Sequence, residues 1–319
     1  MPDATLPIDP AGRFAVTSTY ALAAVPAPAA GVLDELVAAT DGADDPSRYL
    51  IDLMIEKLPE GQARTYAMAV APYVAAYINE RLELVAPRFA DGARALSTGM
   101  LRIAQRFGTI ETFEIASDGG TRALDPGVPG RAAAAGSPRA LRRTIVGLRF
   151  DLQAGREIRD VSFEPLGLPD VTTATFATLS GERLTIDSHA AALPYAALLR
   201  LGLDHAVIPS VVPGADDLGE ALRGLVDCPM LGALTAEWIG LGSPGFYQQA
   251  CDVGLTALAV RLYARIDAID AAALPLEVAG DARAVDADAD RALDGIEAGA
   301  WTGSFAEVAV TGTFAGAAP

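Results

Sequence analysis

The chain has 319 residues, of which 51% are hydrophobic, and a formal net charge of −17. Such an acidic surface repels phosphate, which excludes nucleic acid as a default partner and disfavours docking on anionic lipid headgroups. The length suits one large domain or two ordinary ones, and the mean hydropathy of +0.28 indicates an extensive core or an apolar cavity.

The N-terminal part is predicted to hold one strand followed by helices. Residues 1–12 are rich in small and turn-forming types and are expected to be a flexible leader. Residues 13–22 alternate and contain Thr, Val and Tyr, which is typical of a strand. Two prolines end that strand, and residues 31–108 show helical spacing, so they form the first of two helical insertions.

No membrane-spanning segment is expected in this chain. The longest uncharged run, residues 14–33, contains two prolines and a glycine, which disfavour a spanning helix. Asp3 and Asp9 stand where a signal peptide carries its basic region. Any export signal or lipid anchor is therefore expected upstream of Met1.

Three tyrosines of the first insertion, Tyr66, Tyr73 and Tyr77, repeat on one face of a helix. Core packing or a half-buried interface is one explanation for this stripe. The functional alternative is a lining for an apolar ligand, because tyrosine combines an apolar ring with one hydroxyl.

The middle of the chain is predicted to form strands. A strand at residues 109–116 precedes a long loop, 118–138, whose Gly, Pro and Ala content indicates a disordered segment or a lid. Alternating apolar and polar residues then predict a four-stranded meander with one solvent-exposed face and one buried face. The side chains expected on its buried face are Val146, Leu148, Phe150, Val161, Phe163, Leu184 and Ile186. Of these, Phe150 and Phe163 are expected to line an apolar ligand cavity.

Helical spacing returns over residues 190–270, the second insertion. A Gly/Pro break at residues 240–245 separates its two cysteines, Cys228 and Cys251, so two helices folded back on each other would bring them within disulfide reach. Two buried free thiols are the alternative. The scarcity of lysine and the linker-like leader support the disulfide, which predicts an oxidising compartment: the periplasm, the outer-membrane surface or the exterior.

The C-terminal part is expected to return to strands, with a short strand near residues 276–279 and a last segment at 300–314. Between them, five acidic residues occupy positions 1, 3, 5, 9 and 12 of a calcium loop: Asp286, Asp288, Asp290, Asp294 and Glu297. Arg291 stands where such loops have glycine, and its Cβ resists the left-handed backbone required there. The alternatives are a weak calcium site and a solvated acidic turn.

No set of catalytic residues stands out. The only histidines are His189 and His205. Alternation along a strand would place Asp187 and His189 on one face and Ser188 on the other, so these three cannot form a triad. The sequence has neither a Walker loop nor G-x-G-x-x-G, so no nucleotide cofactor is expected.

Two short motifs resemble lipocalin-like barrels. Gly12-Arg13-Phe14 opens the first strand, where those proteins usually have Gly-x-Trp, and Trp301-Thr302-Gly303 opens the last predicted segment. Phe14 stands in place of the tryptophan. The chain as a whole also resembles exported bacterial proteins of unknown function, which are often lipoproteins. The resemblance implies a lipocalin-like strand pattern and transfers no catalytic residue.

These observations predict one α+β domain over residues 13–319, an antiparallel β-sheet or barrel of about seven or eight strands with two large helical insertions. The first functional hypothesis is a non-enzymatic extracytoplasmic binding protein for a hydrophobic small molecule or lipid. The second is a structural or adhesive cell-surface protein stabilised by calcium and a disulfide. The third is a hydrolase whose site combines distant residues such as Asp187, His189 and His205.

Overall fold

The computed structural model divides the chain into two units. The barrel unit comprises residues 1–26, 103–198 and 272–319, and the helical unit comprises residues 27–102 and 199–271. The residues that the structure describes are 8–27, 29–33, 55, 60–61, 64–65, 68–69, 71–73, 76, 89–117, 136–153, 155–239, 243–269 and 274–319. The helical unit is built from two stretches that overlap the two predicted helical insertions.

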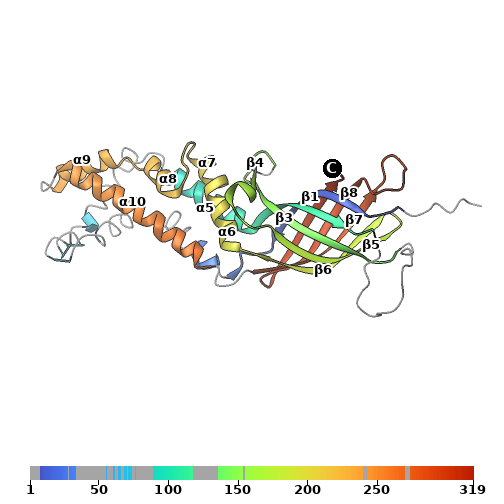
Figure 1. Cartoon of the computed structure of the whole chain (residues 1–319). Helices are drawn as coiled ribbons and strands as arrows, with labels where there is room; N and C mark the ends of the chain where they lie inside the picture. Colours follow the sequence, from blue (N-terminus) through green and yellow to red (C-terminus); the bar gives the residue numbers. More distant parts are fainter. Residues whose placement is uncertain are drawn as a thin grey trace, which may run out of the picture. The chain divides into compact units, whose positions relative to one another are not determined.

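The barrel unit is an antiparallel sheet that closes on itself (Figure 1). Its strands are β1 Gly12–Leu22, β2 Arg106–Ile115, β3 Arg139–Asp151, β4 Ile158–Ser162, β5 Val171–Ser180, β6 Arg183–Leu193, β7 Leu274–Val285, β8 Gly295–Phe305 and β9 Val308–Ala317. The order is β2-β1-β9-β8-β7-β6-β5-β3-β4, and an additional β2–β3 pairing closes eight strands while β4 stays outside. This confirms the α+β class and the barrel of seven or eight strands. The last strand, β9, pairs with the first strand, β1.

Alternation along each strand fills the barrel with apolar side chains. Large rings meet in the interior, where Trp301 stacks on Phe314 at 4.2 Å and Phe113 meets Trp301 edge-on at 6.3 Å between ring centroids. Six of the side chains predicted to be buried are buried: Leu148, Phe150, Val161, Phe163, Leu184 and Ile186. The seventh, Val146, is half-exposed because the β2–β3 register skips it.

The predicted meander is wrong in its strand order. β4 pairs with the second half of β3, and β5 pairs with the first half, so Gly147 faces Ser162 while Ile145 faces Val171. A 3₁₀ turn, η1 Glu164–Leu166, followed by Gly167 at φ 66°, lies between β4 and β5. After β3, the chain forms β4, which lies outside the closed barrel, and then β5, which pairs with β3 inside the barrel wall.

The last predicted segment is a hairpin and not one strand. β8 and β9 are joined by Ala306 and Glu307, which have φ of 46° and 70°. Two-residue hairpin turns with positive φ normally use Asn, Asp or Gly, so the sequence carried no turn signal here. Two other predicted strand boundaries are also wrong. β6 extends to Leu193, although helix was predicted from residue 190, and β7 is longer than the predicted strand at residues 276–279.

The helices whose bounds fall within the described residues are α5 Phe89–Gln105, α6 Tyr195–Gly202, the π-helix η2 Leu203–Val207, α7 Ile208–Val211, α8 Leu218–Leu225, α9 Cys228–Ile239 and α10 Pro244–Asp267. Side chains cap three of them. Asp217 accepts a hydrogen bond from Glu220 N at the start of α8, Asp227 accepts one from Met230 N at the start of α9, and Ser243 accepts one from Phe246 N at the start of α10. Within the described ranges, no helix is long and apolar enough to cross a membrane.

The predicted disulfide is present. Cys228 at the start of α9 is bonded to Cys251 on α10, with 5.7 Å between the two Cα atoms. The helices approach closely, because a Cβ added at Gly232 would lie 2.6 Å from the carbonyl oxygen of Pro244. The bond therefore connects two helices that already pack tightly.

Replacing both cysteines by alanine should lower the free energy of unfolding by about 3 kcal/mol in the chain-entropy model, because the bond closes a loop with a sequence separation of 23. Denaturant unfolding of the oxidised protein and the double variant measures this difference. Thiol titration of the unfolded, unreduced protein should find no free thiol, and two free thiols would contradict the bond.

Candidate functional site

An ion pair lies in the interior of the barrel. Arg143 on β3 donates from Nε to Oε2 of Glu111 on β2 at 2.6 Å, and from Nη2 to Oε1 at 2.7 Å, so the pair is bidentate. Both side chains are fully buried. The Tyr20 hydroxyl accepts a hydrogen bond from Arg143 and lies 3.4 Å from Glu111 Oε1, to which it donates. Strands β1, β2 and β3 are thereby joined through their inward-facing side chains.

Two further strands contribute polar groups to this cluster. Nη1 of Arg143 lies 2.9 Å from Nε2 of His189 on β6, and because guanidinium only donates, the imidazole nitrogen must accept. Nδ1 of His189 then carries the hydrogen and donates to the Asp187 carbonyl at 3.0 Å. The guanidinium also lies 5.0 Å from the ring centroid of Trp301, whose Nε1 donates to Ser18 at 3.1 Å.

The protonation states in this cluster follow from burial and from Arg143. Burial opposes the charge on Glu111, but the adjacent guanidinium outweighs it and holds the pKa of this carboxyl below its usual value. Burial, reinforced by Arg143, lowers the pKa of His189, so the imidazole is neutral near pH 7. Burial raises the pKa of Tyr20, which stays protonated. The cluster is therefore a paired ionic core closed to solvent, and its geometry favours a structural role.

The strand alternation used to predict the direction of His189 does not hold in β6. The register of β6 against β7 shifts between Ile186 and His189, and this bulge leaves both Asp187 and Ser188 exposed while the imidazole turns inward. The prediction that Asp187 and His189 share a face is therefore wrong. His205 lies on the π-helix of the helical unit and is exposed.

Replacing Arg143 by methionine should destabilise the protein by about 3–5 kcal/mol, because Glu111 would remain buried and unpaired. The double variant Arg143→Met/Glu111→Leu should recover much of that loss, since neither charge is then buried. As a control, Arg149→Met removes an exposed bidentate pair with Asp160, whose N–O distances are both 2.7 Å, and should cost about 0–1 kcal/mol. Urea unfolding measures all four proteins, and a double variant as unstable as the single one would contradict the argument.

The acidic loop between β7 and β8 has several hydrogen bonds from backbone N–H groups to its carboxylates. Asp286 Oδ2 accepts from Arg291 N at 3.0 Å, and Asp294 Oδ2 accepts from Ala287 N at 2.7 Å. Arg291 has φ 75°, the left-handed conformation that the sequence argued against. Its backbone is held there by the Asp286 bond and by a second bond, from Asp9 N to its carbonyl at 2.7 Å.

The loop groups three of the five predicted metal ligands. Carboxylate oxygens of Asp286, Asp288 and Asp294 lie within 4.8 Å of one another. Oδ1 of Asp286 is buried and has no hydrogen-bond partner among the described residues. Asp290 instead accepts a bond from Ala292 N at 2.7 Å, and Glu297 is ion-paired with Arg283. The three grouped carboxylates, Asp286, Asp288 and Asp294, offer the oxygen ligands that a hard cation prefers. Calcium binding at this loop stays a prediction.

Millimolar calcium should raise the thermal midpoint of the wild-type protein, because a bound cation relieves the repulsion among the three carboxylates. The expected affinity is weak, on the order of 10⁻⁴–10⁻³ M. Asp288→Ala should abolish the rise, while Asp170→Ala, which removes an exposed carboxylate elsewhere on the barrel unit, should keep it. An equal rise in all three proteins would reduce the loop to an acidic turn.

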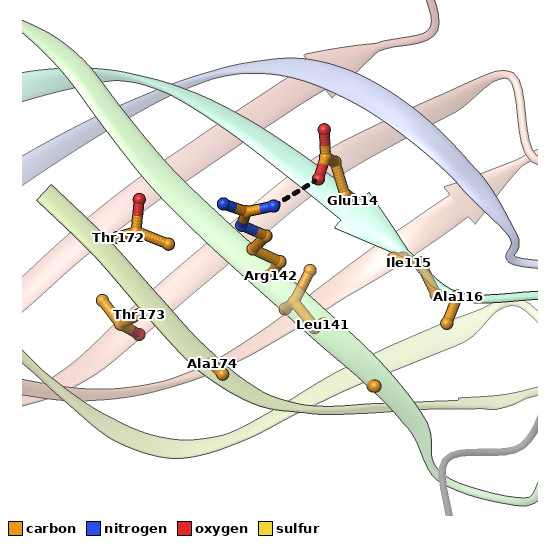
Figure 2. A pocket seen from close by; sticks show the side chains of 9 residues that line it. Glu114, Ile115, Ala116, Leu141, Arg142, Thr172, Thr173 and Ala174 are labelled. Atoms are coloured by element: carbon orange, nitrogen blue, oxygen red, sulfur yellow. Dashed lines mark ion pairs between the residues drawn. The ribbon is translucent and has the colours of Figure 1, made fainter. Parts of the chain in front are cut away.

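A groove lies on the barrel wall where β2, β3 and β5 run side by side (Figure 2). Its volume is about 520 Å³, which is within the range of small-molecule sites. The residues that line it are Glu114, Ile115, Ala116, Ala140, Leu141, Arg142, Thr172, Thr173 and Ala174. Of these, Leu141 and Ile115 are almost fully buried, at 1% and 4% exposed.

Small outward-facing residues create this groove. Residues directly opposite on neighbouring strands share a face, and one such row runs from Glu114 through Arg142 to Ala174. Ala140 and Ala116 lie near the adjacent strand ends, where Ala116 N donates to the Ala140 carbonyl at 3.0 Å. The alanine methyls leave space that larger side chains would fill, and the Arg142 guanidinium stands at its edge.

The predicted ligand residues do not line this groove. Phe150 and Phe163 are in the barrel unit and are 0% and 5% exposed, so neither borders open space. Tyr73 is 69% exposed, while Tyr66 and Tyr77 lie outside the described residues, as do residues 118–135 of the predicted lid. Nothing in the sequence pointed to Arg142 or Glu114, because their relation depends on strand register.

Comparison with known proteins finds no family model, curated protein or solved structure that matches this chain. The resemblance to lipocalin-like barrels therefore rests only on the two short sequence motifs. Gly12 and Phe14 open β1 as expected, whereas Trp301 lies within β8, the second strand from the end. Any function must be argued from the geometry of the sites.

Proposed function

We propose that the protein is a non-enzymatic binding protein for a hydrophobic ligand such as a lipid, and that the ligand docks in the groove on β2, β3 and β5. The supporting observation is the combination of a hollow of about 520 Å³, a lining that includes three alanines, and a charged rim formed by Arg142 and Glu114. Ligand sites are commonly apolar hollows with a few polar groups that fix orientation. The groove fits this description, and a ligand could dock there while the side chains packed inside the barrel stay in place.

The chemistry of the lining residues favours binding over catalysis. Among the nine residues, Glu114 and Arg142 face each other as an ion pair, and neither is placed as a base beside a nucleophile. Thr172 lies 3.4 Å from the Thr144 hydroxyl, which is no general base. A ligand in this groove would be held and released unchanged.

An extracytoplasmic location belongs to this proposal. The disulfide between Cys228 and Cys251 supports it, because such bonds persist in oxidising compartments. Extracellular calcium at the acidic loop would be compatible with the same location.

A structural or adhesive cell-surface role is the second candidate. The observation that favours it is the packed barrel interior, in which Phe14, Phe113 and Phe305 are fully buried. Such a barrel is stable without a ligand, so its outer wall could serve contacts alone. Native mass spectrometry and organic extraction of purified protein separate the candidates, because a co-purifying lipid is expected only for the binding protein.

Filling the groove should abolish ligand binding without unfolding the protein. Ala174 is exposed and directly opposite Arg142, so Ala174→Trp would place an indole in the hollow. We expect at least a tenfold loss of affinity for an environment-sensitive fatty-acid probe. The matched control is Ala315→Trp on the outer face of β9, which should bind as the wild type does. The absence of saturable binding to the wild type would overturn the proposed function.

A further inference from the structure

We infer that the groove selects amphipathic ligands with an anionic head, a carboxylate or a phosphate ester, and that Arg142 binds this head. The inference rests on the proposed function and names the ligand class for the same site. It draws on three independent features of the outer wall: loosely paired arginines, a local reversal of charge and apolar space beside the guanidinium.

The ion pairs at the rim are loose. Arg142 Nη1 lies 3.8 Å from Glu114 Oε2, and Arg13 Nε lies 3.8 Å from Oε1 of the same carboxylate. Hydrogen bonds between such groups are normally about 2.7–2.9 Å. By contrast, the exposed pair of Arg183 with Asp281 on the same barrel has a hydrogen bond of 2.9 Å. The side chain of Arg142 makes no hydrogen bond with any described residue, so its five N–H donors remain available for a bidentate anion.

The charge at the rim is opposite to that of the chain. Arg13, Glu114 and Arg142 face one another across β1, β2 and β3, and together they carry a net charge of +1 in a protein of −17. One carboxylate between two guanidinium groups is already neutralised, so an added cation would be repelled. An anionic head can take over Arg142 while Glu114 keeps its contact with Arg13.

The positions proposed for the anionic head and for the hydrocarbon tail of the ligand lie next to each other. Ala174 lies directly across from Arg142 on β5 (Figure 2), and Ala116 and Ala140 line the same hollow. A single molecule can therefore place its anion on the guanidinium and its hydrocarbon on the alanine methyls. Because the Arg142 side chain is 64% exposed, the ion pair contributes modestly and mainly sets selectivity, while apolar contact supplies most of the affinity.

The test compares head groups on one hydrocarbon chain. A fluorescent long-chain carboxylate, its uncharged alcohol and the matching amine are titrated into the wild type, Arg142→Gln, Glu114→Gln and the control Arg183→Gln, which removes an exposed paired arginine elsewhere on the barrel wall. The wild type should bind the carboxylate about threefold to tenfold more tightly than the alcohol. Arg142→Gln should abolish that preference, Glu114→Gln should increase it because one repelling charge is lost, and Arg183→Gln should leave it unchanged.

Salt provides a second measurement that needs no variant. Raising the ionic strength should weaken carboxylate binding by the wild type and leave alcohol binding unaffected, because only the head-group contact is screened. The unfolding midpoint of each variant confirms that it is folded.

The outcomes separate the inference from the proposed function. Equal binding of carboxylate and alcohol by the wild type would overturn the assignment of the head and leave the groove as an apolar site. Tighter binding of the amine would overturn it in favour of Glu114. Failure of all three probes to bind would overturn the proposed function itself. Displacement of the carboxylate by inorganic phosphate at equal concentration would show a simple anion site and overturn the assignment to an amphipathic ligand.

Discussion

The buried ion pair of Arg143 with Glu111 is the constraint on which the barrel depends. It lies at the β2–β3 pairing, which is the pairing that closes the sheet on itself. Neither charge tolerates burial alone, so closure and pairing have to occur together. A shift of β3 by one residue would turn Arg143 outward and leave Glu111 unpaired inside. The pair therefore specifies the register of the closing strands, and Tyr20 and His189 extend that specification to β1 and β6.

The same strand register builds the outer wall. Arg142 and Arg143 are consecutive on β3, and the pleat sends them to opposite faces. The inward arginine is bound tightly and desolvated, whereas the outward one makes only a 3.8 Å pair with Glu114 at the edge of the groove. A rigid interior holds the backbone beneath the groove in place, so Ala174 and Glu114 keep their positions on either side of Arg142. The arginine of the buried ion pair and the arginine that we propose binds the ligand head are thus consecutive in the chain.

A full barrel changes where a ligand can be expected. Eight-stranded barrels are just wide enough either to be filled by side chains or to hold one small ligand, and this chain uses aromatic rings and the ionic cluster for the first solution. Apolar residues that alternate on a strand look the same in both cases, which is why Phe150 and Phe163 were expected to border a cavity. Only the packing of rings from other strands distinguishes a core from a binding lumen.

Local patterns in the sequence determined the strand-rich architecture, most of the buried face of β3 to β6, the cysteine pairing across a helix break and the spacing of the acidic loop. Each of these depends on residues near one another in the chain. The tertiary structure alone decided the displacement of β4, the β8–β9 hairpin at Ala306 and Glu307 and the bulge that turns His189 inward, because these follow from pairing and packing without a local signal. The row of Arg13, Glu114, Arg142 and Ala174 comes from four strands. Such a row exists only once long-range register is set, so no single segment could have predicted it.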